Sequence, residues 1–119
     1  MQEFDFHGTH VIADITGIDP AIIRDDQAIL TGMNAGLGRS GATLCGMQIK
    51  RFEPNGLTLI YLLSESHTSV HTYPERNALF FDAFTCGDTC EPRAFVEALV
   101  DTLGACEAKV QVLCRGDAP

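Results

Sequence analysis

Residues 42–64 read ATLCGMQIKRFEPNGLTLIYLLS, which is two apolar stretches separated by a short turn sequence. The segment Glu53-Pro54-Asn55-Gly56 has the composition of a turn, because proline fixes one backbone dihedral while asparagine and glycine tolerate unusual ones. The sequence therefore predicts a β-hairpin with strands at 42–52 and 57–64.

Elements on either side of the hairpin complete the predicted fold. A helix begins at Asp19-Pro20, where aspartate suits the N-cap and proline suits the first helical position. We expect this helix to end at Gly36 and Gly38. A second helix begins at Pro92 and ends at Gly104. Three further strands are predicted at 8–15, 77–85 and 108–114.

The resulting order is β-α-β-β-β-α-β, which predicts the α+β class. We expect a two-layer sandwich in which two helices cover one face of a mainly antiparallel sheet. The other face is then left without a cover, and apolar strands on such a face require a partner. A homodimer is therefore expected, since most oligomers are symmetric assemblies of one chain.

Size, composition and charge restrict the possible partners. The chain has 119 residues and a mass of 12.9 kDa, so we expect one domain spanning residues 1–119. Its net charge of −8 disfavours binding to nucleic-acid backbones. No apolar run approaches the roughly 20 residues that cross a bilayer. Neither nucleic acid nor a membrane is expected as a partner.

The five cysteines favour a reducing compartment. Their number is odd, and the first residues lack the basic and apolar pattern of an export signal, so we expect no disulfide framework. The sequence therefore predicts free thiols in a cytoplasmic protein.

The segment after the hairpin concentrates side chains that can perform chemistry. His67 and His71 are four residues apart, and the same spacing separates Cys86 from Cys90. Extended residues at this spacing lie about 13 Å apart, too far to bind one metal ion together, so no metal site is expected. A serine hydrolase is disfavoured because Ser66 lacks the Gly-x-Ser-x-Gly turn. A structural role at a strand end and a self-processing chain remain as alternatives.

Two runs in this segment are highly specific in combination. They are Glu65-Ser66-His67-x-x-x-His71-Thr72-Tyr73-Pro74-Glu75 and Phe84-Thr85-Cys86-Gly87-Asp88, and they resemble the bacterial and archaeal S-adenosylmethionine decarboxylase family. The resemblance extends to Phe52-Glu53-Pro54-Asn55-Gly56 and to Gly8-Thr9-His10-Val11-Ile12-Ala13-Asp14. It covers about residues 6–116.

The resemblance implies a pyruvoyl-dependent enzyme that cleaves itself between Glu65 and Ser66. In this route the Ser66 hydroxyl attacks the Glu65 carbonyl, the resulting ester is eliminated, and residue 66 becomes a pyruvoyl group. The family places a histidine at the position of His71 and a hydroxyl at that of Thr58 to assist processing. During turnover the substrate forms a Schiff base with the pyruvoyl group, and the Cys86 thiol returns a proton after carbon dioxide has left.

The resemblance also implies a small cationic amino-acid substrate. Phe52 is expected to stack on adenine and Glu75 to bind ribose hydroxyls, with His67 as a further substrate-binding residue. The expected substrate is S-adenosylmethionine, whose decarboxylated product donates aminopropyl groups in spermidine and polyamine synthesis. Departures from the family pattern, such as Thr9 and Thr68, leave an arginine or ornithine decarboxylase as an alternative. A second alternative is an uncleaved, non-catalytic homologue that acts as a binding or regulatory subunit.

Overall fold

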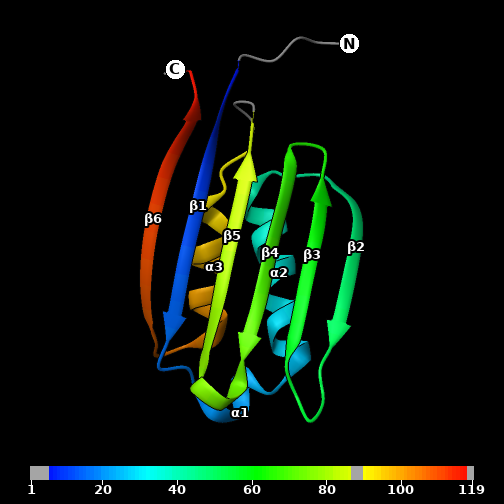
Figure 1. Ribbon diagram of the computed structural model, residues 1–119, viewed down its shortest axis with the longest axis vertical. Helices are drawn as coiled ribbons and strands as arrows, with labels where there is room; N and C mark the ends of the chain where they lie inside the picture. Colours follow the sequence, from blue (N-terminus) through cyan, green and yellow to red (C-terminus); the bar gives the residue numbers. More distant parts are fainter. Residues whose placement is uncertain (1–5, 87–89, 118–119) are drawn as a thin grey trace.

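The structure is a computed structural model that describes residues 6–86 and 90–117. Within these residues, six strands form one antiparallel sheet in the order β2-β3-β4-β5-β1-β6 (Figure 1). The strands are β1 (His7–Thr16), β2 (Leu44–Arg51), β3 (Leu57–Leu63), β4 (Ser66–Tyr73), β5 (Ala78–Thr85) and β6 (Glu107–Gly116). The helices are α1 (Pro20–Ile23), α2 (Asp26–Ser40) and α3 (Arg93–Leu103), with a 3₁₀ helix η1 (Pro74–Arg76).

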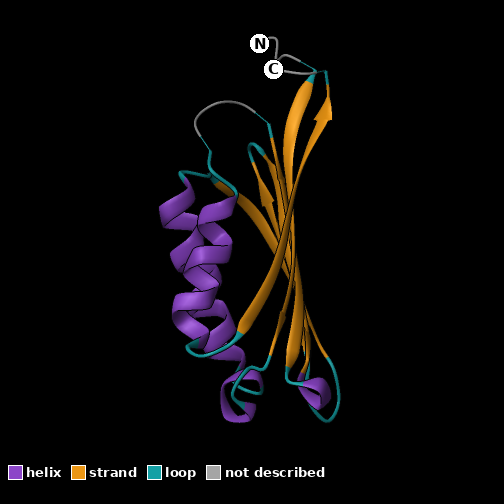
Figure 2. Ribbon diagram, turned by 90° about the vertical axis from the view of Figure 1, so that its left-hand side faces the viewer, coloured by secondary structure: helices purple, strands orange, loops and turns teal. Residues whose placement is uncertain are grey.

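Helices α2 and α3 lie on one face of the sheet, which gives the molecule two layers (Figure 2). The predicted α+β sandwich, with two main helices over an antiparallel sheet, is therefore confirmed. The predicted hairpin is β2 and β3, and its turn is closed where the Phe52 N–H donates to the Gly56 carbonyl at 3.0 Å. Helix α3 begins after Pro92 and ends at Gly104, as predicted.

Strand β4 is an element that the predicted order omits. We expected five strands, with His67 to His71 leaving a strand, whereas Ser66–Tyr73 pairs with β3 on one side and β5 on the other. Thr68, Val70 and Thr72 of β4 are buried on the side of the core, and among these three only the valine is fully apolar. The period of two is therefore weak in hydropathy, and the buried Ser69 interrupts it in burial.

Helix α2 continues through Gly36 and Gly38, where we expected its end, and stops at Gly41 in a left-handed conformation (φ 78°). A Cβ atom on Gly36 would lie 2.6 Å from a ring carbon of Phe95 in α3. This glycine therefore allows the two helices to approach each other closely and does not end the first one. The predicted first helix is also divided, because Asp25 caps a new helix at its start.

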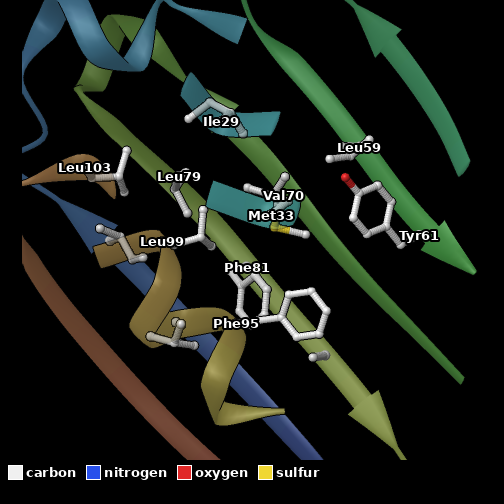
Figure 3. Close-up of a cluster of buried hydrophobic side chains, with 14 of the residues drawn as sticks. Ile29, Met33, Leu59, Tyr61, Val70, Leu79, Phe81, Phe95, Leu99 and Leu103 are labelled. Carbon is white, nitrogen blue, oxygen red and sulfur yellow. The ribbon is translucent and has the colours of Figure 1, made fainter. Parts of the chain in front are cut away.

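The hydrophobic core lies between the helices and the sheet (Figure 3). Phe81 of β5 and Phe95 of α3 pack with ring centroids 6.2 Å apart, beside the fully buried Met33 and Leu99. Burial of each such side chain contributes about 1.5–3 kcal/mol. Because alternate residues of a strand point to opposite faces, this core also determines which side chains point away from the helices.

We call the sheet surface without helices the open face. Large apolar side chains remain exposed there, including Leu62 at 58% and Phe80 at 46%. Tyr73 packs against Phe80 with ring centroids 5.0 Å apart. His67 and His71 project onto the same face, because their neighbours in β4 are the buried residues. The chemically active side chains of β4 thus share a surface with exposed apolar groups.

Candidate active site

The peptide bond between Glu65 and Ser66 lies at the tip of the β3–β4 hairpin, beside the end of β5. The backbone N–H of Cys86 donates to the Glu65 carbonyl oxygen at 3.1 Å, and the Cys86 thiol donates to the same oxygen at 3.3 Å. Two donors on one carbonyl oxygen stabilise the negative charge that develops there when a nucleophile attacks the carbon.

The backbone of Ser66 is strained. Its φ of 146° lies in a region that residues other than glycine rarely adopt. The preceding side chain is also held, since the Thr43 N–H donates to the Glu65 carboxylate at 3.1 Å. The strain is therefore located at the bond that the sequence predicts to be cleaved. We call Glu65, Ser66 and Cys86 the cleavage-site cluster.

Four other predicted site residues lie together at the opposite end of β3 and β4. Thr58 Oγ1 and His71 Nδ1 are 3.1 Å apart, within hydrogen-bond distance. Both line a cavity of about 230 Å³, together with Phe52 and Glu75. We call these four residues the His71 cluster. It combines an imidazole and a hydroxyl, which can exchange a proton, with an aromatic ring and a carboxylate.

The two clusters are separated along β4. Ser66 and His71 are five residues apart in an extended strand, which places them about 16 Å apart at roughly 3.3 Å per residue. Neither His71 nor Thr58 reaches the Ser66 hydroxyl of its own chain. The resemblance gives these residues roles in one processing reaction, and within one chain the structure places them at two ends of the open face.

A larger cavity of about 480 Å³ adjoins the cleavage-site cluster and contains Cys86 and His67. The sequence motifs predicted no role for its other lining residues, which are Phe6, His7, Gly8, His10, Phe84, Arg115 and Gly116. Gly8 lets the Phe84 ring lie against β1, since a Cβ atom there would be 2.5 Å from that ring. No spacing in the sequence indicates this cavity, because the pairing of β1 with β5 and β6 creates it.

Asp82 of β5, for which no sequence motif predicted a role, accepts three side-chain hydrogen bonds on the open face. The Nε2 atoms of His10 and His67 lie 2.8 and 3.1 Å from its Oδ2 atom, and Ser69 donates to Oδ1. Burial raises the pKa of this carboxyl group, but the three hydrogen bonds and the attraction of His67 outweigh burial, so the pKa lies below its usual value. Asp82 is therefore a carboxylate at neutral pH.

Other kinds of site receive no support from the described part of the chain. In residues 6–86 and 90–117, no group of three or more His, Cys, Asp or Glu side chains is arranged to hold a metal ion. The five cysteines are free thiols. Within the same ranges, no helix has the length and apolar character needed to span a membrane.

Comparison with known proteins places the chain in a family. The model of the family described as S-adenosylmethionine decarboxylase matches residues 9–116. The chain belongs to this family. The S-adenosylmethionine decarboxylase proenzyme 2 of Bacillus cereus is 37% identical over 115 residues, which cover 97% of this chain and 94% of that protein. The S-adenosylmethionine decarboxylase proenzyme of Prochlorococcus marinus is 41% identical over 98 residues, which cover 82% of this chain and 78% of that protein.

A solved structure agrees with this assignment to the S-adenosylmethionine decarboxylase family. The adenosylmethionine decarboxylase from Aquifex aeolicus superposes with a TM-score of 0.85 and is 28% identical. The match covers 97% of this chain and 95% of that one. The resemblance predicted from the sequence motifs is therefore confirmed at the level of the family.

The residues of this S-adenosylmethionine decarboxylase family member fit a pyruvoyl group made from residue 66. Such a group needs a serine hydroxyl, an adjacent carbonyl that can be attacked, and stabilisation of the charge that results. Ser66 provides the first, and Cys86 binds the Glu65 carbonyl with two donors. The cleavage-site cluster therefore has a nucleophile, a carbonyl that can be attacked and two donors to its oxygen, and these groups fit the formation of a pyruvoyl group.

Proposed function

We propose that this chain is a pyruvoyl-dependent decarboxylase of S-adenosylmethionine that cleaves itself between Glu65 and Ser66. The observation that carries the proposal is the contact of Cys86 with the Glu65 carbonyl, which places two donors on the bond to be cleaved. Membership of the family over residues 9–116 supports the same activity. The product would supply aminopropyl groups for polyamine synthesis.

Processing begins when the Ser66 hydroxyl oxygen attacks the Glu65 carbonyl carbon. A C–O bond forms, the C–N bond to Ser66 breaks, and an ester joins the two parts of the chain. Loss of the Ser66 α-proton and departure of the Glu65 carboxylate leave an enamine at residue 66. Water converts the enamine to a ketone and releases ammonia. The products are residues 1–65 and a pyruvoyl-capped chain of residues 66–119.

The backbone strain at Ser66 favours the first step. A residue held in a sparsely populated φ region costs about 1–3 kcal/mol, and the φ of Ser66 is 146°. Breaking the peptide bond to Glu65 releases this constraint. The uncleaved chain is therefore raised in free energy relative to the ester.

The pyruvoyl group, once formed, supplies an electron sink for the carbanion that carbon dioxide leaves behind. Cys86 lies beside residue 66 as a thiol that can donate a proton to the substrate carbon. His67 lines the same cavity and is available to contact the substrate. The chain thus carries its cofactor in its own backbone, formed from Ser66.

The lining of the larger cavity favours S-adenosylmethionine over the smaller basic amino acids. Phe6 and Phe84 provide aromatic surfaces there, and Phe52 provides another in the His71 cluster. Aromatic surfaces suit a purine ring better than the flexible chains of arginine or ornithine. The net charge of −8 attracts all three cationic substrates and does not separate them.

We further infer that two copies pair through their open faces to form a homodimer. Ser66 and His71 lie about 16 Å apart within one chain, and large apolar side chains such as Leu62 and Phe80 are exposed between these ends. A two-fold related copy with its strands reversed would place the His71 cluster of one protomer over the cleavage-site cluster of the other. Each site would then contain residues from both chains.

Cleavage and activity are tested together on the purified protein. Intact mass spectrometry under denaturing conditions should give two chains divided after Glu65. The later chain should be lighter than a serine-terminated chain by the mass of one ammonia. Release of labelled carbon dioxide is then compared among S-adenosylmethionine, arginine and ornithine. Turnover of arginine or ornithine alone would refute the proposed substrate, and one uncleaved chain after long incubation would favour the non-catalytic homologue.

The shared site is tested by mixing two inactive variants. Ser66→Ala removes the nucleophile, and His71→Ala removes the imidazole that assists processing. If each site uses both protomers, refolding the two variants together should restore cleavage of the chain that carries His71→Ala. Each variant refolded alone serves as the control. Cleavage that never recovers in the mixture, although the mixture forms dimers, would contradict the shared site.

A further inference from the structure

The carboxylate of Asp82 joins two histidines from different strands beneath the larger cavity. Asp82 lies opposite Ser69 of β4 and Ile12 of β1 in the sheet register, so both neighbouring strands can reach it. Its Oδ2 atom is 2.8 Å from His10 Nε2 and 3.1 Å from His67 Nε2. An ionised carboxylate has no hydrogen to donate. Both Nε2 atoms must therefore carry the hydrogen.

The tautomer of His10 is determined from both sides of its ring. Arg115 Nη1 lies 3.0 Å from His10 Nδ1, and an arginine side chain only donates hydrogen bonds. Nδ1 of His10 must then accept, while Nε2 donates to Asp82. His10 is thus a neutral imidazole with a single arrangement of its hydrogen, and all its ring nitrogens are occupied.

His67 differs from His10 at its second nitrogen. Its Nε2 atom donates to Asp82, but within residues 6–86 and 90–117 its Nδ1 atom has no hydrogen-bond partner. The side chain is 39% exposed and lines the cavity that contains Cys86. In its neutral form the ring therefore has a lone pair on Nδ1, one residue along the chain from Ser66.

We propose that Asp82 is a positioning residue that holds His67 in the Nε2–H tautomer, so that His67 Nδ1 accepts a proton from the α-ammonium group of the amino-acid substrate. This inference rests on the proposed function, in which the substrate amine must reach a carbonyl at residue 66. An ammonium group has no lone pair with which to attack a carbonyl carbon. The proton passes from the substrate nitrogen to Nδ1, and the lone pair left on that nitrogen becomes the nucleophile.

The neighbouring groups explain why His67 rather than His10 has this role. His10 has no free nitrogen, because Arg115 and Asp82 use both. The rings of His10 and His67 lie edge to face at a centroid distance of 6.3 Å. This packing and the shared carboxylate restrict rotation of the His67 ring. A ring that cannot rotate keeps its acceptor nitrogen in one position.

The tautomer is measured directly by nitrogen-15 NMR of the histidine rings. In the wild-type protein we expect His67 to show a protonated Nε2 and an unprotonated Nδ1 above its titration range. Asp82→Asn offers an amide that can donate to Nε2, so the hydrogen of His67 should move in part to Nδ1. An Nδ1–H tautomer in the wild type, or ring shifts that Asp82→Asn leaves unchanged, would overturn the proposal.

Kinetics separate this role from a purely structural one. Asp82→Asn should lower kcat/KM for decarboxylation about ten- to a hundred-fold, by analogy with the loss of a residue that orients a metal-binding histidine. Asp82→Glu should recover part of the loss. Asp14→Asn is the matched control, because it makes the same change at an exposed residue of the neighbouring strand. An equal loss in both asparagine variants would refute a specific role for Asp82.

The failure of this inference and the failure of the proposed function give different results. An active wild-type enzyme with the Nδ1–H tautomer at His67 would refute the inference and leave the proposed function intact. A wild-type protein with the expected tautomer but no decarboxylation of any of the three amino acids would refute the proposed function and, with it, the transfer of a substrate proton to His67.

Discussion

The Cys86 thiol provides a quantitative test of the processing geometry. It is one of two donors to the Glu65 carbonyl oxygen, at 3.3 Å, and the other is its own backbone N–H at 3.1 Å. Loss of one strong donor of this kind slows a reaction about 10²–10³-fold, and a thiol is a weak donor. We therefore expect Cys86→Ala to slow cleavage about ten- to a hundred-fold, which corresponds to about 1.4–2.7 kcal/mol of activation free energy.

The backbone N–H remains in this variant, so cleavage should be slower but not abolished. Cys86→Ser retains a hydroxyl donor and should recover most of the cleavage rate. Decarboxylation should still be impaired in the serine variant, because a hydroxyl is a weaker acid than a thiol.

The assay follows the uncleaved chain over time on denaturing gels after synthesis or refolding. Cys114→Ala is the matched control, since Cys114 is an exposed residue of β6. The control should cleave at the wild-type rate. If Cys86→Ala also cleaves at the wild-type rate, the thiol does not stabilise the charge on the carbonyl oxygen. Equal impairment of cleavage in the alanine and serine variants would contradict hydrogen bonding as the cause.

Three further predictions concern the serine, the helix contact and the acid response. Ser66→Ala should abolish both cleavage and decarboxylation, and two chains in its mass spectrum would contradict the assigned nucleophile. Gly36→Ala places a methyl group 2.6 Å from the Phe95 ring and should lower the free energy of unfolding by about 1–3 kcal/mol. In Gly38→Ala the new methyl group meets nothing within 4 Å, so this variant should have a free energy of unfolding about 0.5–1 kcal/mol higher. Urea denaturation measures the free energy of unfolding of both variants. A Gly36→Ala protein more stable than Gly38→Ala would contradict the close contact between α2 and α3. Folding lowers the pKa of Asp82, so the ionised carboxylate stabilises the folded protein. This stabilisation is fully present above the pKa of about 3.9 that aspartate has in the unfolded chain, and it is lost as pH falls through the lower pKa of the folded protein. Below about pH 4 the free energy of unfolding should therefore fall less steeply with pH in Asp82→Asn than in the wild type. The same pH dependence in the variant and the wild type would refute this.

The fold was predictable where sequence patterns are local. The hairpin of β2 and β3 follows from turn residues between apolar stretches, and Pro92 and Gly104 bound α3 as expected. Strand β4 was missed because serine, threonine and histidine occupy most of its positions. The end of α2 was misplaced because Gly36 serves a contact with another helix, which no local pattern reveals.

The candidate site was predictable in its residue types but not in its arrangement. The motif includes Ser66, His71 and Cys86, and only the extended form of β4 shows that His71 lies far from the other two. Asp82 was missed because its partner His10 is 72 residues away in the sequence. Strand order decides such contacts, and strand order depends on pairings between distant segments.

The order of the strands has a consequence for the lifetime of a cleaved molecule. A cut after residue 65 leaves β1, β2 and β3 on one product and β4, β5 and β6 on the other. Among the described strands, β1 is inserted between β5 and β6, and β3 pairs with β4, so backbone hydrogen bonds hold the products together. Once such a pair unfolds, its halves must meet by diffusion before the sheet can form again. Refolding then depends on protein concentration, whereas the uncut chain folds as a single molecule. The persistence of the cleaved form is therefore governed by how slowly it unfolds.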